Sequence, residues 1–379
     1  MKVDPVARRD TPLARKLKES IRRHGPMPVQ TYMSRCLWDD EYGYYRRQPI
    51  FGAAGDFITS ADISQIFGEL IGVWTGVVWQ NVFGSPDPVT FVEFGPGRGT
   101  LMRDALRAAR VVPGFVDAAR VHLVEASAAL TEVQRKTLSS HHPRITWGTG
   151  LDEFALPAII VANEFLDSWP AAQWIKTSDG WRIKGVTLDD AGDLQFTAID
   201  GDCPREAFEL LLPDAPPGTV IESQNLDQLA HALRALTDRG PVAMLIIDYG
   251  HTTATAGDTL QAVRAHAYES PLASPGEADL TVHVNFYNLA STLYRAGLAL
   301  DGPVTQAEFL GAIGIVERAS RLMAANPSRA SEIESGVARL LAPNGMGTRF
   351  KVLAARSREL PPLPGFEAAV TPAARAEGP

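Results

Sequence analysis

The chain has 379 residues, 45% of them hydrophobic, and a formal net charge of −8 at pH 7. This length suits one elaborated domain or two ordinary ones. The negative charge argues against nucleic-acid binding as the main task. No apolar run reaches about 18 residues, so we predict no membrane insertion. The two cysteines, Cys36 and Cys203, have no metal-site or disulfide spacing, which fits a reducing compartment.

The first residues are charged and lack an apolar segment, so the sequence shows no secretory signal. A helical pattern begins near residue 12, which argues against a transit peptide, and we expect a cytoplasmic protein. Leu13, Leu17 and Ile21 have helical spacing up to a Gly-Pro break. Two further helical patterns follow, and residues 1–87 are therefore predicted to form a helical N-terminal extension.

Three alternating glycines follow a short apolar run at residues 89–94. A helical pattern comes next, so the stretch is typical of a strand, a tight turn and a helix. Glycines allow positive φ and a close approach of a ligand to the backbone, and a helix N-terminus offers free N–H groups. A plain strand-to-helix turn is the alternative. The predicted cofactor contacts in this stretch are Gly95, Gly97, Gly99, Thr100 and Leu101.

Two carboxylates accompany this turn. Glu93 lies two residues before Gly95, and an acid at that point suits a cationic ligand better than a pyrophosphate. The glycine spacing also differs from the dinucleotide pattern G-x-G-x-x-G, which disfavours a nicotinamide-dependent oxidoreductase. Glu125 ends the next strand and is predicted to accept hydrogen bonds from ribose hydroxyls; an exposed strand-end charge is the alternative. The pattern resembles motif I of S-adenosylmethionine (SAM) methyltransferases.

Strands and helices alternate from residue 88 onward, as in a doubly wound α/β sheet. Between the fourth and fifth strands, residues 172–240 contain β-like runs and a helix, and they are predicted to form an inserted α+β lobe. The last strand is expected to be an antiparallel or edge addition, and residues 356–379 a mobile tail. The predicted strands are 89–94, 121–125, 145–147, 158–162, 242–247 and 349–354.

A polar cluster follows the fourth strand, at the edge where ligands bind in open α/β sheets. Asn163, Glu164 and Asp167 are our candidates for catalysis, and Asn163 also for cofactor binding. If the nucleophile is an arginine, its charge persists, and carboxylates would hold and orient it. A helix or turn cap is the alternative for Asp167.

Weaker substrate-binding candidates are Glu222, Asp248, Tyr249 and His251. A long polar segment follows His251, as in a lid or binding loop. His251 could also act as a general base. The spacing of His251, His266 and His283 matches no standard ligand motif, so no metal site is predicted.

Several of these stretches together resemble the MidA-type family of SAM-dependent methyltransferases, which includes a mitochondrial assembly factor for respiratory complex I. They occur in the family's order and span roughly residues 30–355. The stretches are Tyr42-Gly43-Tyr44-Tyr45, Gly55-Asp56-Phe57-Ile58-Thr59-Ser60, Ile63-Ser64-Gln65-Ile66-Phe67-Gly68, residues 93–101, Asn163-Glu164-Phe165-Leu166-Asp167, Asp248-Tyr249-Gly250-His251 and Asp279-Leu280-Thr281-Val282-His283-Val284.

The resemblance implies a class I methyltransferase fold that binds SAM and releases S-adenosylhomocysteine, with Gly55, Asp56 and Thr59 covering the cofactor. It also implies symmetric dimethylation of an arginine on a complex I subunit of the 49-kDa type. Ala61 stands where the family usually has proline, and Ser168-Trp169 replaces a smaller, more aliphatic pair. Asn285 stands where the family commonly has aspartate, which questions a carboxylate role there. The absence of a transit peptide suggests a bacterial member, whose substrate need not be the mitochondrial one.

Two other functions stay open at this point. One is methylation of a small molecule, although the insertion and the long loop favour a bulky substrate. The other is a non-enzymatic assembly chaperone that keeps a SAM-binding fold. A homodimer is also left open.

Overall fold

The computed structural model describes residues 8–46, 59–253 and 256–367, and its contacts divide the chain into two compact units. Unit 1 combines Met1–Phe57, Asp167–Asn225 and Thr253–Asn285, and unit 2 combines Ile58–Leu166, Leu226–Thr252 and Phe286–Pro379. Each unit is therefore built from three separate stretches of the sequence.

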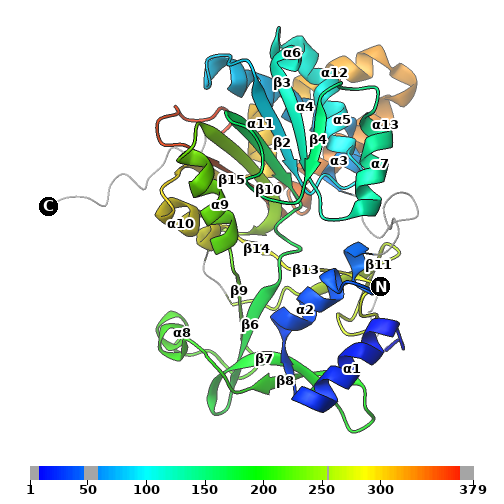
Figure 1. Cartoon of the computed structure of the whole chain (residues 1–379), viewed down its shortest axis with the longest axis vertical. Helices are drawn as coiled ribbons and strands as arrows, with labels where there is room; N and C mark the ends of the chain where they lie inside the picture. The colour runs from blue at the N-terminus through cyan, green and yellow to red at the C-terminus, as the bar shows by residue number, and fades with distance from the viewer. Residues whose placement is uncertain (1–7, 47–58, 254–255, 368–379) are drawn as a thin grey trace, which may run out of the picture. The chain divides into compact units, whose positions relative to one another are not determined.

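The centre of unit 2 is a sheet with the strand order β15-β16-β10-β5-β2-β3-β4 (Figure 1). The pairs from β10 to β4 are parallel, and β16 is antiparallel to both of its neighbours. The sheet belongs to the predicted doubly wound α/β class. Its strands are β2 (Val89–Phe94), β3 (Ala119–Val124), β4 (Ile145–Gly148), β5 (Ala158–Asn163), β10 (Val242–His251), β15 (Ala299–Thr305) and β16 (Phe350–Arg356).

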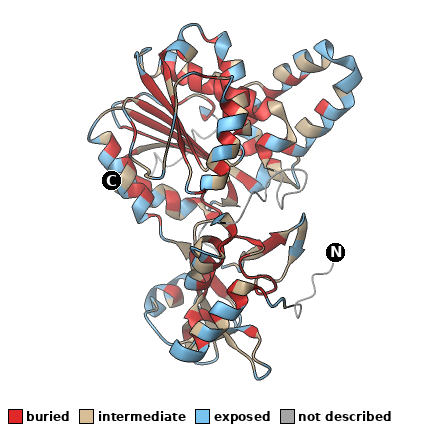
Figure 2. Cartoon of the chain, turned by 45° about the vertical axis from the view of Figure 1, so that its right-hand side comes forward, coloured by how far each residue is buried: buried red, intermediate tan, exposed pale blue. Residues whose placement is uncertain are grey.

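Helices cover both faces of this sheet, and Figure 2 shows its strands largely buried. The face with α4, α5 and α11 to α13 contains the main hydrophobic core, whereas α9 and α10 lie on the other face. The helices are α3 (Ser60–Ile63), α4 (Gln65–Asn81), α5 (Thr100–Ala108), α6 (Phe115–Ala118), α7 (Ala128–Leu138), α9 (Asp227–Thr237), α10 (Phe286–Arg295), α11 (Gln306–Ala312), α12 (Ile315–Ala325), α13 (Ala330–Leu341) and α14 (Met346–Arg349), with 3-10 turns at Ala109–Val111 and Pro327–Arg329.

Helix α4 packs closely against α5 because glycines occupy its contact face at every fourth position. A Cβ atom on Gly72 would lie 2.2 Å from the carbonyl oxygen of Ala105. A Cβ on Gly68 would lie 2.9 Å from the Cβ of Asp104. The backbones of the two helices are thus in contact, which any side chain at Gly72 would prevent.

Unit 1 holds the first two helices and two small sheets. One sheet has the order β1-β7-β6-β9 with β8 on β7, and the other has the order β12-β11-β13. The predicted β-rich insertion is an antiparallel meander, β6-β7-β8. The elements are α1 (Pro12–His24), β1 (Met27–Pro28), α2 (Val29–Trp38), a 3-10 turn at Tyr44–Arg46, β6 (Ala171–Thr177), β7 (Gly180–Leu188), β8 (Leu194–Ile199), α8 (Arg205–Leu211), β9 (Val220–Gln224), β11 (Gln261–Arg264), β12 (Ala267–Glu269), β13 (Asp279–Thr281) and β14 (Val284–Asn285).

The structure divides the chain differently from the predicted scheme of an extension at 1–87 and an insertion at 172–240. Helices α3 and α4 belong to unit 2, because the glycine face of α4 packs on α5. The insertion in unit 1 spans Asp167–Asn225, and α9 returns to unit 2.

The last predicted strand is antiparallel, one of the two alternatives that the sequence left open, and β15 pairs with its outer side. One further expectation needs correction. The tail expected to be mobile is packed over residues 356–367. Leu363 and Phe366 are buried in the main core there, and Trp74 donates a 2.9 Å hydrogen bond to the carbonyl of Pro364.

Candidate cofactor and methyl-transfer site

The glycine turn connects β2 to α5 at the carboxyl end of the sheet. Gly95, Gly97 and Gly99 all have positive φ, at 62°, 52° and 77°, a conformation that side chains disfavour. A Cβ on Gly95 would lie 2.8 Å from the ring of Phe165. No atom of the described residues lies within 4 Å of a Cβ built on Gly97, so the backbone at that point is open toward them. The turn thus has the conformation and the open side that the sequence predicted for a ligand contact.

Glu93 is the single acidic residue of β2 and is buried, with 3% of its surface exposed. It accepts a hydrogen bond from the backbone of Met102 in the first turn of α5, while its Oε2 atom has no partner among the described residues. Burial, together with the charge of Glu125, raises the pKa of Glu93 to about 8, and the Met102 bond opposes this rise. A ligand cation beside Oε2 would stabilise the carboxylate form.

Glu125 follows β3 and is held by two donors. Its Oε1 accepts the backbone N–H of Ser127 at 2.7 Å, and its Oε2 accepts the amide of Gln134 at 3.0 Å. Burial raises the pKa of Glu125, and these hydrogen bonds lower it. A carboxylate has about four acceptor positions, so Glu125 can still accept ligand hydroxyls. The sequence did not indicate Gln134 to us.

The segment after β5 contains the polar cluster that the sequence singled out. Glu164 has a φ of 51°, unusual for a residue with a side chain. Its Oε1 accepts the backbone N–H of Ser60 at 2.8 Å and the amide N–H of Asn163 at 3.1 Å. Asn163 Oδ1 and Ser60 Oγ are both buried without a hydrogen-bond partner in the described part of the chain. Glu164 thereby orients Asn163, with its amide oxygen directed away from the carboxylate.

Ser60 was not among our predicted site residues. Its neighbour Thr59 was, and its hydroxyl donates to Asp62 at 3.1 Å. The hydroxyl of Ser60 is fully buried, whereas a short polar loop before a helix is typical of an exposed cap. The other two predicted residues of this loop, Gly55 and Asp56, lie outside the described residues.

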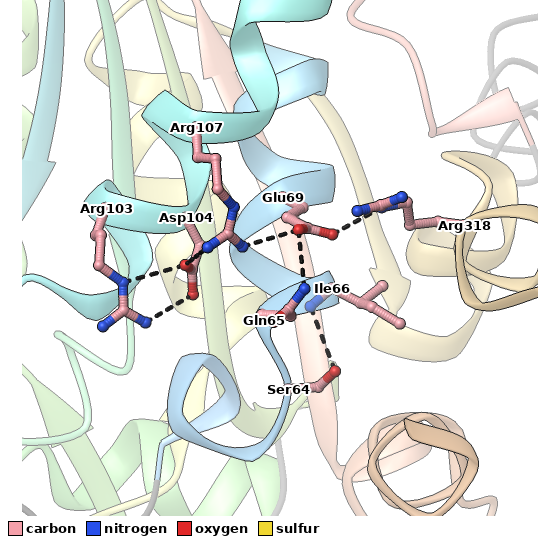
Figure 3. A network of polar contacts seen from close by, with 8 residues as sticks. All are labelled: Ser64, Gln65, Ile66, Glu69, Arg103, Asp104, Arg107 and Arg318. Atoms are coloured by element: carbon pink, nitrogen blue, oxygen red, sulfur yellow. Dashed lines mark hydrogen bonds and ion pairs between the residues drawn. The ribbon is translucent and has the colours of Figure 1, made fainter. Parts of the chain in front are cut away.

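Two buried carboxylates, on α4 and α5, bind arginines of α5 and α12 in a polar network (Figure 3). Glu69 of α4 accepts hydrogen bonds from Gln65, from Arg107 of α5 at 2.8 Å and from Arg318 of α12 at 2.7 Å. Asp104 of α5 pairs with Arg107 at 3.0 Å. Both carboxylates are at most 2% exposed. The network connects α5, which starts at the glycine turn, to α4 and α12.

Asp167 belongs to unit 1, separate from Asn163 and Glu164. Its backbone carbonyl accepts the N–H of Val282, next to β13. In the same unit the hydroxyl of Tyr45 donates to Asp279 at 3.1 Å. Burial and the negative charges of Asp279 and Asp167 raise the pKa of Tyr45 well above its usual value. The sequence motifs at residues 42–45, 167 and 279 therefore gather in unit 1.

The weaker substrate-binding candidates at the end of β10 make contacts that hold neighbouring segments in place. Asp248 is fully buried and accepts the backbone N–H groups of Leu166 at 3.0 Å and Tyr249 at 2.9 Å. Tyr249 packs its ring on Phe350. Burial and the charge of Lys351 lower the pKa of His251. Asp248 thus fixes the segment that carries the polar cluster, and its role toward a substrate stays a prediction.

Glu222 lies on β9 of unit 1. It accepts the backbone N–H of Thr259 at 2.8 Å, the hydroxyl of Thr259 at 2.5 Å and an amide N–H of Gln173. Burial raises its pKa, while the donors lower it. The carboxylate thus anchors the loop after β10 to the meander. Across the described ranges, no group of three or more His, Cys, Asp or Glu side chains could hold a metal ion.

The polar groups at the carboxyl end of this sheet fit the chemistry of SAM. Glu93 Oε2, Asn163 Oδ1 and Ser60 Oγ are buried acceptors without a partner among the described residues, and SAM carries an ammonium and a sulfonium charge. The carboxylate of Glu125 suits a ribose diol, and the open side of Gly97 allows close approach to the backbone.

Comparison with known proteins agrees with this chemistry. A family model described as "putative S-adenosyl-L-methionine-dependent methyltransferase" matches residues 70–304. The chain belongs to this family. The protein arginine methyltransferase NDUFAF7 of Mus musculus is 36% identical over 91% of this chain and 84% of its own length. The corresponding protein of Homo sapiens is 33% identical over 93% of this chain and 85% of its own length.

Solved structures show the same fold. A protein from Burkholderia thailandensis bound to S-adenosylhomocysteine matches with a TM-score of 0.82 and 27% identity, over 93% of this chain and 94% of that one. This protein is a SAM-dependent methyltransferase with a class I α/β fold. Within the described ranges, every helix is too short or too polar to cross a membrane.

Proposed function

We propose that this enzyme transfers methyl groups from SAM to an arginine side chain of a protein. The observation that carries the proposal is the 32–36% identity, over most of the chain, to relatives named protein arginine methyltransferases. The sequence resemblance adds the finer proposal of symmetric dimethylation on a complex I subunit of the 49-kDa type. The substrate is then a protein partner that presents a flexible arginine.

We assign the cofactor contacts to residues at the carboxyl ends of three neighbouring strands, β5, β2 and β3. The backbone at residues 95–101 would approach the methionine part of SAM, and Glu125 would accept the ribose hydroxyls. Glu93 Oε2 and Asn163 Oδ1 would accept hydrogen bonds from the ammonium group or contact the sulfonium. When bound, SAM would supply an activated methyl group on its sulfonium; as the arginine nitrogen takes this methyl group, the C–S bond breaks and S-adenosylhomocysteine leaves.

The residues of the polar cluster would orient the guanidinium. Arginine keeps its charge, so a nitrogen must lose a proton as the new N–C bond forms, and an acceptor must lie beside it. Glu164 Oε1 already holds Ser60 and Asn163, which gives Glu164 a positioning role in addition. For Asp167, which belongs to unit 1, the acceptor role stays a proposal from the sequence.

The test is incubation of the purified full-length chain with methyl-labelled SAM and extract from a strain that lacks this protein. We expect label in a protein band, and mass spectrometry should find dimethylarginine on a complex I subunit. A matched pair of variants, Asn163→Ala and Asn81→Ala at the exposed end of α4, should differ, with label lost only in the first. Label confined to small molecules would replace this proposal by the small-molecule alternative.

The chaperone alternative has its own outcome. If the double variant Glu164→Gln, Asp167→Asn lacks methyl transfer yet restores complex I in the deletion strain, methylation is not the required function. We expect no restoration.

A further inference from the structure

A single glutamine links the main parts of the proposed cofactor site. Gln134 of α7 is fully buried, and its amide Nε2 donates to the carbonyl of Gly97 at 2.8 Å and to Glu125 Oε2 at 3.0 Å. Its Oε1 accepts the indole N–H of Trp147, on β4, at 3.0 Å. One side chain therefore contacts the glycine turn, the strand-end acid and the neighbouring strand.

The position of Gln134 within its helix makes this arrangement unusual. The buried residues of α7 are Leu130, Gln134 and Leu138, four residues apart along one face. A leucine would suit the middle of that stripe, because a buried amide costs free energy unless its groups are hydrogen-bonded. Gln134 makes three hydrogen bonds, and two of them go to groups that we assign to SAM. The amide of Gln134 therefore has a role beyond filling space in the core.

We propose that Gln134 is a positioning residue for SAM, holding the carbonyl of Gly97 and the carboxylate of Glu125 in one fixed arrangement. This inference rests on the proposed cofactor contacts of those two residues. Holding the carbonyl fixes the plane of the peptide that follows Gly97, on the open side of the turn. Holding Oε2 leaves the remaining acceptor positions of Glu125 in place for the ribose before the ligand arrives, which reduces the ordering cost of binding.

The charge balance around Glu125 supports the same role. Besides Gln134, the carboxylate receives the backbone N–H of Ser127, while the acid that faces it from β2 is Glu93. Gln134 is a neutral donor, so it stabilises the Glu125 carboxylate without adding a cation that would compete with SAM. A lysine or arginine there would instead form an ion pair and occupy the acid.

The test measures binding of S-adenosylhomocysteine to the full-length protein by isothermal titration. Gln134→Met keeps the volume but removes both donors, and we expect about tenfold weaker binding. Gln134→Glu keeps the shape and should also bind at least tenfold more weakly, which covers the case in which the methionine variant folds poorly. Lys136→Met is the matched control, because Lys136 lies on the exposed face of the same helix, and it should bind within about twofold of the parent.

A double-mutant cycle separates positioning from a general effect on folding. In a Glu125→Ala background, Gln134→Met should weaken binding by only about threefold, because one of the two groups that Gln134 holds is already gone. An equal tenfold loss in both backgrounds would overturn the inference. So would parent-like binding by both Gln134 variants while Glu125→Ala and Gly97→Val lose the ligand, a result that leaves the proposed site standing. Parent-like binding by Glu125→Ala and Gly97→Val would overturn the site and the inference together.

Discussion

The contact between α4 and α5 gives a direct test of how the site is supported. Replacing Gly72 by alanine adds one methyl group at the point where the two helix backbones meet. The new Cβ would lie 2.2 Å from the carbonyl oxygen of Ala105 and 2.4 Å from its Cα, whereas ordinary contacts begin at 3.4 Å. Backbone atoms cannot rotate away, so the helices would have to separate by roughly 1 Å.

Overpacking of this kind costs about 1–3 kcal/mol, and the upper end applies here because no side chain can move aside. The alanine itself would favour a helix by up to about 1 kcal/mol, which leaves a net loss of roughly 2 kcal/mol. That loss corresponds to a fall in Tm of about 4–8 °C. Because α5 starts at Thr100, its displacement should also weaken S-adenosylhomocysteine binding, by about tenfold.

The assay is differential scanning calorimetry with and without S-adenosylhomocysteine, alongside titration of the ligand. Gly311 in α11 provides the matched control, because a Cβ built on it has no neighbour within 4 Å in the described part of the chain. Gly311→Ala should keep or slightly raise the Tm and leave binding unchanged. If Gly72→Ala matches Gly311→Ala in both measurements, the helix contact does not support the site as we reason.

Three more predictions follow from burial. Burial raises the pKa of Glu93 to about 8, so between pH 4.5 and 8 the carboxyl group ionises in the unfolded chain but not in the ligand-free folded state. The folded state therefore loses stability as the pH rises through this range. Glu93→Gln should flatten this pH dependence in thermal scans from pH 5 to 8.5. Glu69→Ala should destabilise by about 2 kcal/mol in urea unfolding, more than Glu332→Ala at an exposed ion pair. Deleting residues 357–379 should lower Tm by several degrees, because Leu363 and Phe366 leave the core; an unchanged Tm would contradict that packing.

The local patterns of the sequence predicted much of the sheet and the turn. Strand β2 is predicted and observed at residues 89–94, and the glycines after it adopt the positive φ that their residue type allows. These features depend on alternation, turn chemistry and helical periodicity, which are local properties. The fold class followed from them.

Features that depend on distant partners were missed. Strand β15 contains Gly302-Pro303, which looks like a loop, and only its pairing with β16 makes it a strand. The proline-rich segment at 361–364 looked mobile because its apolar residues are few, yet Trp74, nearly 300 residues earlier, holds it. Gln134 carried a readable signal, a polar residue at the centre of an apolar stripe, but its partners lie on two other elements.

The glycine turn depends both on its own residues and on residues far away in the sequence. Its φ angles follow from its own glycines, but its place beside the sheet depends on Phe165 packed on Gly95 and on Gln134 bonded to Gly97. Motif spacing therefore predicts the class of ligand, whereas affinity depends on supports that the motif does not contain. A relative that keeps the three glycines but lacks the amide at position 134 should bind SAM in the same place and more weakly, unless another donor reaches the acid that follows β3.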